Sequence, residues 1–292
     1  MKQKNLLLGA IMAISVSLGL VACQKNYSGD VQANNSGKEQ LSLYLTDGPG
    51  LFDQVLVEIR SVKVLVDTSK DTRRHDNEDW DRRGSDDKKK DSSFVWETLN
   101  ITPGVYDILK FRNGADTLLA ASNITKGSIR LIKIELGTNN SVVKDSVVYP
   151  VKLPANANTY VLIKLRGNEC EEYQVGRRRL WLDFDITRSI IQERDGQFFL
   201  RPVFHFFTVS NTASISGKVG PRDGYPVVTV FNASDTAYAL PDKEGNYKIR
   251  GLASGTYSVY INASNGFKDT TINNVVLKAP GNTTVATVKL SK

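Results

Sequence analysis

Apolar and polar residues alternate along most of this chain, and the alternation restricts it to one class of fold. Leu41, Leu43 and Leu45 are separated by Ser42 and Tyr44, and residues 180–186 repeat the pattern. A period of two is typical of a strand with one buried face. No stretch keeps a helical period over three turns. The alternation therefore predicts an all-β protein.

Other apolar segments predict further strands, at residues 55–66, 94–99, 105–111, 117–121, 129–136, 142–151, 160–165 and 198–209. The buried parity changes around Arg60 and Ser61, which predicts a bulge there. Asn113-Gly114 predicts a type I′ hairpin turn. The nearly continuous apolar run at 198–209 predicts a strand buried on both faces. Together these segments predict a β-sandwich with Greek-key-like connections over residues 41–210.

A second series of short strands follows the hinge at Asn211-Thr212. Apolar segments between residues 213 and 292 are separated by turns rich in Gly, Asn and Asp. Such spacing is typical of a small sandwich. We therefore expect two β-sandwich domains in tandem.

The N-terminus has the pattern of an export signal. Lys2 and Lys4 precede an apolar run at residues 6–21, and the small Ala22 precedes Cys23. Leu20-Val21-Ala22-Cys23 resembles the bacterial lipobox, which implies cleavage before Cys23 and acylation of that cysteine. Residues 1–22 would then be a lipoprotein signal peptide, and we expect Cys23 to hold the protein in the cell envelope, at the outer membrane. The alternative is a transmembrane anchor, which the polar residues after Cys23 disfavour.

Two polar segments carry few apolar residues. Residues 23–40, with the lipidated cysteine, predict a flexible tether. The segment 70–91 balances basic with acidic residues and predicts a disordered insertion at a hairpin tip. A calcium loop there, with Asp76, Glu78, Asp79 and Asp81 as ligands, fits poorly because Trp80 takes a ligand position.

The sequence has few residues of the types that carry out catalysis, so we expect that the protein is not an enzyme and binds no cofactor. The chain has two histidines, His75 in the charged insertion and His205 in an apolar segment where a core position is the simpler interpretation. Acidic neighbours of Cys170 oppose a nucleophilic role. The net charge of +7 is modest for this length, and no nucleic-acid motif accompanies it.

One strand offers a candidate binding site. Trp181, Asp183 and Asp185 are expected on the face opposite Leu182 and Phe184. Two carboxylates beside an aromatic ring could hold calcium or a sugar, and Asp47 is a possible third calcium ligand. The simpler interpretation is structural: the acids cap backbone groups or pair with the arginines at 177–179.

Two family resemblances cover the two domains. Residues 41–207 resemble a lipoprotein family known as domain of unknown function 4382, on the matches Leu45-Thr46-Asp47, Val55–Val66, Trp96, Tyr106–Leu109, Gly127–Leu136, Val151–Pro154, Leu182–Asp185 and Leu200–Val203. The family usually has Pro-Ser-Gly where this chain has Pro154-Ala155-Asn156, and usually lacks the charged insertion. The resemblance implies a surface β domain without a stated activity.

The second resemblance covers residues 213–290. The segments Ile215–Val219, Pro226–Val228, Asp242–Ile249 and Gly251–Tyr257 resemble the carboxypeptidase regulatory-like domain, a transthyretin-like sandwich grouped with carbohydrate-binding-like folds. The resemblance implies an accessory module, with Gly245 and Gly255 in tight turns and Tyr247 and Tyr257 in the core.

These observations predict a lipid-anchored, non-enzymatic binding or adhesion module whose partners are the membrane, through acylated Cys23, and a glycan or an envelope protein. The first alternative is a structural or fimbria-like component of the envelope. A hydrolase that uses Asp183 and Asp185 is the remote one.

Overall fold

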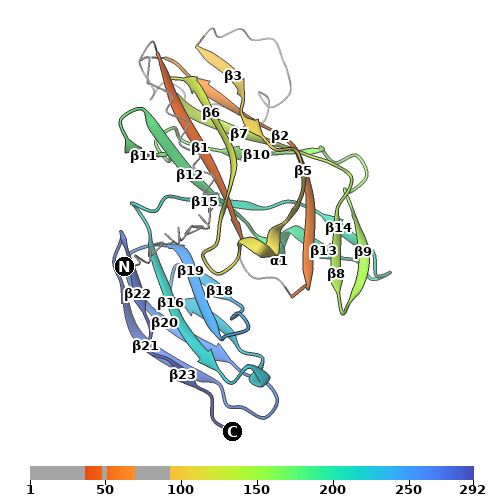
Figure 1. Cartoon of the computed structure of the whole chain (residues 1–292), viewed down its shortest axis with the longest axis vertical. Helices are drawn as coiled ribbons and strands as arrows, with labels where there is room; N and C mark the ends of the chain where they lie inside the picture. Colours follow the sequence, from red (N-terminus) through yellow and green to blue (C-terminus); the bar gives the residue numbers. More distant parts are fainter. Residues whose placement is uncertain (1–36, 48–50, 70–92) are drawn as a thin grey trace, which may run out of the picture. The chain divides into compact units, whose positions relative to one another are not determined.

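The computed structural model describes residues 37–47, 51–69 and 93–292, which belong to one compact unit. The described chain is almost wholly β, as the alternation predicts (Figure 1). The predicted signal peptide, Cys23, most of the tether and the charged insertion with His75 lie outside the described residues. Within the described part, no helix is long and apolar enough to cross a membrane.

The first sheet of residues 38–207 has the strand order β11-β12-β1-β6-β4, and β15 pairs with β12. Its strands are β1 (Lys38–Asp47), β4 (Asn100–Ile101), β6 (Thr117–Thr125), β11 (Glu171–Gln174), β12 (Arg177–Phe184) and β15 (Phe204–Phe207). The central pair β1–β12 is parallel. The carboxyl ends of these two strands therefore meet at the same edge of the sheet.

The second sheet has the order β10-β7-β2-β8-β9-β14-β13, and β3 and β5 also pair with β2. Its strands are β2 (Gln54–Asp67), β3 (Phe94–Thr98), β5 (Gly104–Asp107), β7 (Ser128–Leu136), β8 (Ser141–Lys144), β9 (Val147–Lys152), β10 (Tyr160–Lys164), β13 (Ile190–Gln192) and β14 (Phe198–Leu200). Apolar residues of both sheets form one buried cluster, from Leu41 to Leu200.

The predicted bulge in β2 is confirmed. The register of β2 against β7 shifts between Ile59 and Ser61. Val57 and Ile59 before the shift, and Val62 and Val64 after it, are all buried in the same cluster. One extra residue thus keeps both halves of a long strand facing one core although the sequence parity changes.

Residues 213–290 form a separate core between two four-stranded sheets. One sheet has the order β19-β16-β22 with β23 beside β16, and the other has the order β18-β17-β20-β21. The strands are β16 (Ala213–Gly220), β17 (Val227–Phe231), β18 (Thr236–Ala239), β19 (Asn246–Leu252), β20 (Gly255–Asn262), β21 (Thr270–Leu277), β22 (Gly281–Thr284) and β23 (Val288–Lys289).

Three of the four glycine and tyrosine predictions for this core are confirmed and one is wrong. Gly245 has φ +84° in a turn, and a Cβ there would lie 2.2 Å from the Val219 carbonyl oxygen. Tyr247 and Tyr257 are buried in the core. Gly255, however, begins β20 and does not have a positive φ.

Several predicted strands are divided by turns. The segment 198–209 is not one strand buried on both faces, because β14 pairs with β13 and β9 whereas β15 pairs with β12. The segment 142–151 is a hairpin whose turn residues Asp145 and Ser146 both have positive φ. Residues 108–111 form a 3₁₀ helix before the Asn113-Gly114 turn. The hairpin predicted at this turn is wrong, because β5 pairs with β2 whereas β6 pairs with β1 and β4. The sequence pattern does not reveal these turns, because turn residues can continue the alternation of apolar and polar positions that marks a strand.

The predicted tether is too long at its C-terminal end. Residues 38–40 already belong to β1, and Glu39 is buried against Arg178, with 2.9 Å between the Glu39 Oε1 and an Arg178 guanidinium nitrogen. Glu39 can therefore be buried in the sheet because Arg178 pairs with its charge.

Candidate binding site

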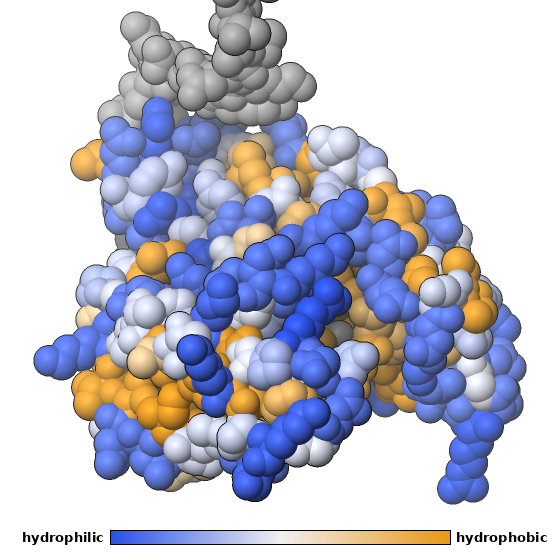
Figure 2. All heavy atoms as spheres, turned by 60° about the horizontal axis from the view of Figure 1, so that its bottom comes forward, coloured by the Kyte–Doolittle hydropathy of each residue, from blue (hydrophilic) through white to orange (hydrophobic). Residues whose placement is uncertain are grey.

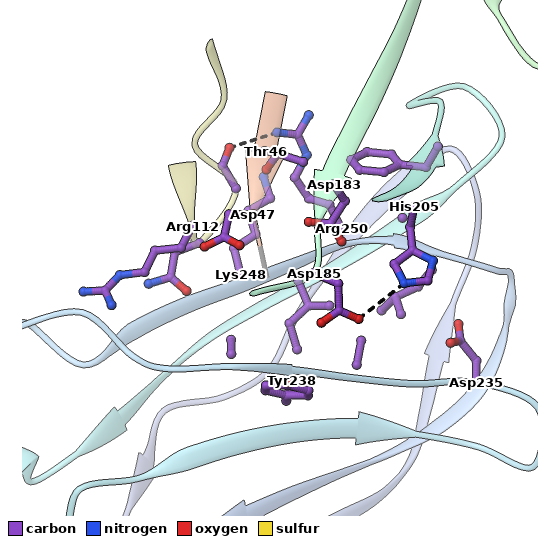
Figure 3. A pocket seen from close by; sticks show the side chains of 18 of the residues that line it. Thr46, Asp47, Arg112, Asp183, Asp185, His205, Asp235, Tyr238, Lys248 and Arg250 are labelled. Carbon is purple, nitrogen blue, oxygen red and sulfur yellow. Dashed lines mark hydrogen bonds and ion pairs between the residues drawn. The ribbon is translucent and has the colours of Figure 1, made fainter. Parts of the chain in front are cut away.

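A pocket of about 360 Å³ lies beside the carboxyl ends of β1 and β12 (Figure 3). Its other wall comes from β18 and β19 of the second core. The charged and aromatic residues that line it are Asp47, Arg112, Asp183, Asp185, His205, Phe206, Phe207, Asp235, Tyr238, Lys248 and Arg250. The structure thus brings Asp47, Asp183 and Asp185 to one pocket, as the sequence suggested.

The strand register explains why residues so distant in sequence meet. Thr46 pairs with Asp183 and Asp47 with Phe184 in the parallel β1–β12 ladder. Thr46 Oγ1 donates to the carbonyl oxygens of Phe111 (3.1 Å) and Ala115 (2.9 Å). These bonds fix the end of β1 beside the 112–115 turn.

Asp47 is the most unusual group in the pocket. Its residue is 7% exposed, and neither carboxyl oxygen has a hydrogen-bond partner. The pKa of Asp47 is raised to about 10, first by burial and then by the Asp183 carboxylate, while Arg112 opposes the rise. An ionised carboxylate without a partner is costly in such surroundings. Asp47 therefore either keeps its proton or needs a cationic or hydrogen-donating ligand.

Asp185 has a structural role at the edge of the pocket. It is the N-cap of α1 (Ile186–Ser189), where its Oδ1 accepts a hydrogen bond from the Arg188 backbone N–H at 2.9 Å. Its Oδ2 lies 3.4 Å from His205 Nε2. The capping role was the simpler interpretation of this residue. Arg178 and Arg179, the expected salt-bridge partners, bind Glu39 and Glu171 instead.

His205 is not a core histidine. Its side chain is 53% exposed and faces Asp185 at the pocket (Figure 3). The prediction was wrong because β15 is a short strand whose two middle residues, His205 and Phe206, are exposed, rather than part of one buried strand.

Trp181 is close to the pocket but does not line it. The indole stacks between Tyr44 and Phe207, with centroid distances of 5.0 and 6.0 Å, and its Nε1–H donates to Asp116 Oδ2 at 2.9 Å. Only 5% of the residue is exposed. Trp181 therefore supports Phe207, which lines the pocket, and offers no open face to a sugar.

Arg250 joins the second core to the first at this position. One guanidinium nitrogen donates to Asp116 Oδ2 and to the Gly114 carbonyl oxygen, both at 2.9 Å. Gly114 has φ +79°, and a Cβ there would lie 2.7 Å from Lys248 Cδ. The Asn113-Gly114 turn was predicted from the sequence, but its role as a contact for the second core was not.

The described residues contain no group of three or more His, Cys, Asp or Glu side chains arranged to hold a metal ion. The predicted calcium ligands Asp47, Asp183 and Asp185 share the pocket without forming such a group. The alternative calcium loop at Asp76–Asp81 lies outside the described residues.

Cys170 is buried and carries a free thiol. Burial raises its pKa to about 12, with smaller increases from Glu169 and Glu39 and an opposing effect of Arg178. The sequence suggested that acidic neighbours would raise the pKa of Cys170; Glu169 and Glu39 do so, and burial is the larger cause. A thiol with this pKa is a poor nucleophile.

A comparison with models of known protein families identifies the family of this chain. Residues 38–202 match the model of the family described as a domain of unknown function (DUF4382). The chain belongs to this family. No curated protein matches the sequence.

Solved structures show only distant likeness. A mutant cohesin–X-dockerin complex of Acetivibrio cellulolyticus shares 24% identity over 26% of this chain, with TM-score 0.23, and the match spans 56% of that chain. The minor pilin GBS52 of Streptococcus agalactiae matches 87% of this chain and 97% of its own, at 11% identity and TM-score 0.21. A mutant shaft pilin SpaA of Lactobacillus rhamnosus GG covers the same shares at 11% identity and TM-score 0.23.

Proposed function

We propose that this member of the DUF4382 family is a lipid-anchored, non-enzymatic binding module of the bacterial cell envelope, and that its target is a glycan. The observation that supports binding is the pair of buried Asp47 oxygens without donors, in a pocket that also contains Asp183 and Asp185. A ligand with several hydrogen-bond donors would satisfy these acceptors. Sugars supply such donors, and Tyr238, Phe206 and Phe207 supply rings beside them.

The lipid anchor is proposed from the sequence around Cys23. Acylation of Cys23 would hold the module at the envelope, most simply at the outer membrane. Mass spectrometry of the mature N-terminus would test this part. The expected product begins at an acylated Cys23, and a Cys23→Ser variant should stay uncleaved and lack lipid. A mature N-terminus elsewhere would contradict the anchor.

Glycan binding can be tested with the soluble protein from Lys25 onward. Glycan arrays and pull-downs from envelope extracts should give sugar ligands whose binding falls in an Asp47→Asn variant. Asp195→Asn is the matched control, because Asp195 lies outside the pocket and, among the described residues, hydrogen-bonds to Gln197 alone. No binding across sugars, matrix proteins and envelope extracts would refute the binding function.

The second candidate is a structural or fimbria-like envelope component. Large apolar side chains remain exposed at Val147, Val148 and Val175 (50, 65 and 89%), and Figure 2 shows hydrophobic patches among hydrophilic residues on one face. Such side chains can serve self-association. Sedimentation of the mature protein distinguishes the two candidates, because an assembly component must form oligomers. A purely monomeric profile would contradict the structural role.

A hydrolase remains the remote candidate. It would require an activity that disappears in an Asp183→Ala, Asp185→Ala double variant whose fold is intact. We expect no such activity, because Asp185 is occupied as a helix cap.

A further inference from the structure

We propose that the glycan bound in this pocket carries a free primary ammonium group, as an amino sugar does, and that Asp47 is the counter-ion of that group. This inference rests on the proposed function and names the chemical class of its ligand. Three properties of the pocket support it: an unpartnered buried acceptor, two neighbouring carboxylates that repel this acceptor, and the absence of a ready-made metal site among the described residues.

The unpartnered acceptor is Asp47. Both oxygens are buried without a hydrogen-bond donor, although the residue lines an accessible pocket. Native proteins satisfy nearly all buried polar atoms, so such a group requires an explanation. A ligand that brings its own donors to the pocket would supply the missing partners.

The surroundings favour a positively charged donor over a neutral one. Asp183 and Asp185 both act on Asp47 as like charges, and Arg112 is the cation that opposes them. Figure 3 shows the Arg112 side chain extending away from the Asp47 carboxyl group. Arg250 is already engaged by Asp116 and Gly114. An incoming cation would therefore relieve repulsion that a hydroxyl group leaves in place.

An ammonium group fits these acceptors better than a metal ion. Calcium requires six to eight oxygen ligands at about 2.3–2.6 Å, and no suitable group of three side chains exists among the described residues. An ammonium group donates up to three hydrogen bonds at ordinary distances. Tyr238 lies below Asp185 in Figure 3, and its hydroxyl contacts Thr187 Oγ1. Its ring could pack on the sugar that carries the ammonium group.

The test compares two probes of equal length whose sugar nitrogens are either free and charged or acetylated and neutral. Chitosan oligosaccharides carry free amino groups, and chitin oligosaccharides of the same length carry N-acetyl groups. Titration calorimetry would use the full lipidated chain in detergent at about pH 6, where the amino groups are protonated, and at physiological salt. We expect chitosan oligosaccharides to bind at least about tenfold more tightly. This preference should be lost in Asp47→Asn and kept in Asp195→Asn.

Each outcome decides a different part of the proposal. Equal binding of the two probes, or preference for chitin, would overturn the ammonium inference and leave glycan binding standing. Calcium binding that depends on Asp47, with no response to chitosan, would overturn it in favour of a metal. If neither probe binds but another glycan does, only the ammonium inference is overturned. If no glycan binds at all, the proposed function is overturned as well. If Asp47→Asn does not fold, Asp183→Asn should reduce the same preference.

Discussion

At the residue scale, Asp47 dominates the chemistry of the described chain. The ordinary pKa of an aspartate is 3.8, whereas in the folded protein the pKa of Asp47 is about 10. Asp183, Asp185 and Asp107 add to the effect of burial, and Arg112 opposes it. Folding thus keeps a proton that the unfolded chain releases.

This proton predicts how stability depends on pH. Above the pKa of the unfolded chain, the folded state binds more protons, so the free energy of unfolding falls as pH rises. The fall is at most about 1.4 kcal/mol per pH unit. Asp47→Asn should remove this slope between about pH 5 and 8.5, as measured by urea unfolding of the unliganded protein. Parallel slopes in Asp47→Asn and the wild type would show that Asp47 is ionised in the fold.

The second residue-scale prediction concerns Cys170. Its pKa of about 12 and its burial leave almost no accessible thiolate. In the soluble protein from Lys25 onward, where Cys170 is the single thiol, iodoacetamide at about pH 8 should leave the native protein unmodified and alkylate the unfolded chain. Mass spectrometry measures both. Rapid alkylation of the native protein would contradict the buried position.

At the scale of elements, turns decide where apolar runs are divided. Asn113 and Gly114 form a turn with φ +57° and +79°, whereas Asp145 and Ser146 form the β8–β9 turn with φ +52° and +65°. Asn and Gly adopt this conformation with less strain than Asp and Ser. The first turn could be predicted from the sequence because its residues are the favoured ones, and the second could not because they are less characteristic.

The comparison of the two turns gives a stability prediction. Replacing Asp145-Ser146 by Asn-Gly should raise the free energy of unfolding by about 1 kcal/mol. Ser141→Gly within β8 is the matched control and should lower it by a similar amount, because glycine weakens a strand. Urea unfolding measures both. A loss of stability in the Asn-Gly variant would contradict the assigned turn.

At the scale of the whole molecule, the described residues form two large hydrophobic cores and one small cluster around Leu65 and Leu131. Polar contacts, such as that of Arg250 with Asp116 and Gly114, join the two large cores. The second core has its own buried residues, Tyr257 and Val259 among them. These observations support the proposed domain that begins at residue 213, a boundary that remains a prediction.

Fragment experiments would test that boundary. We expect residues 213–292 to unfold cooperatively as an isolated fragment. Arg250→Ala should lower the free energy of unfolding of the full chain by about 1 kcal/mol, because the ion pair with Asp116 is lost. It should leave the fragment unchanged, since both partners lie in the first core. An effect of equal size in both would mean that Arg250 acts within its own core.

The sequence by itself determined the fold class, most of the strands and the β2 bulge, because alternation and parity are local consequences of strand geometry. It also placed Asp47, Asp183 and Asp185 among the candidates. Only the tertiary structure decided that His205 is exposed, that Trp181 is covered and that Asp47 is buried without a partner. Burial and pairing depend on segments distant in sequence, here the parallel β1–β12 pair and the wall from the second core, and no local pattern contains that information.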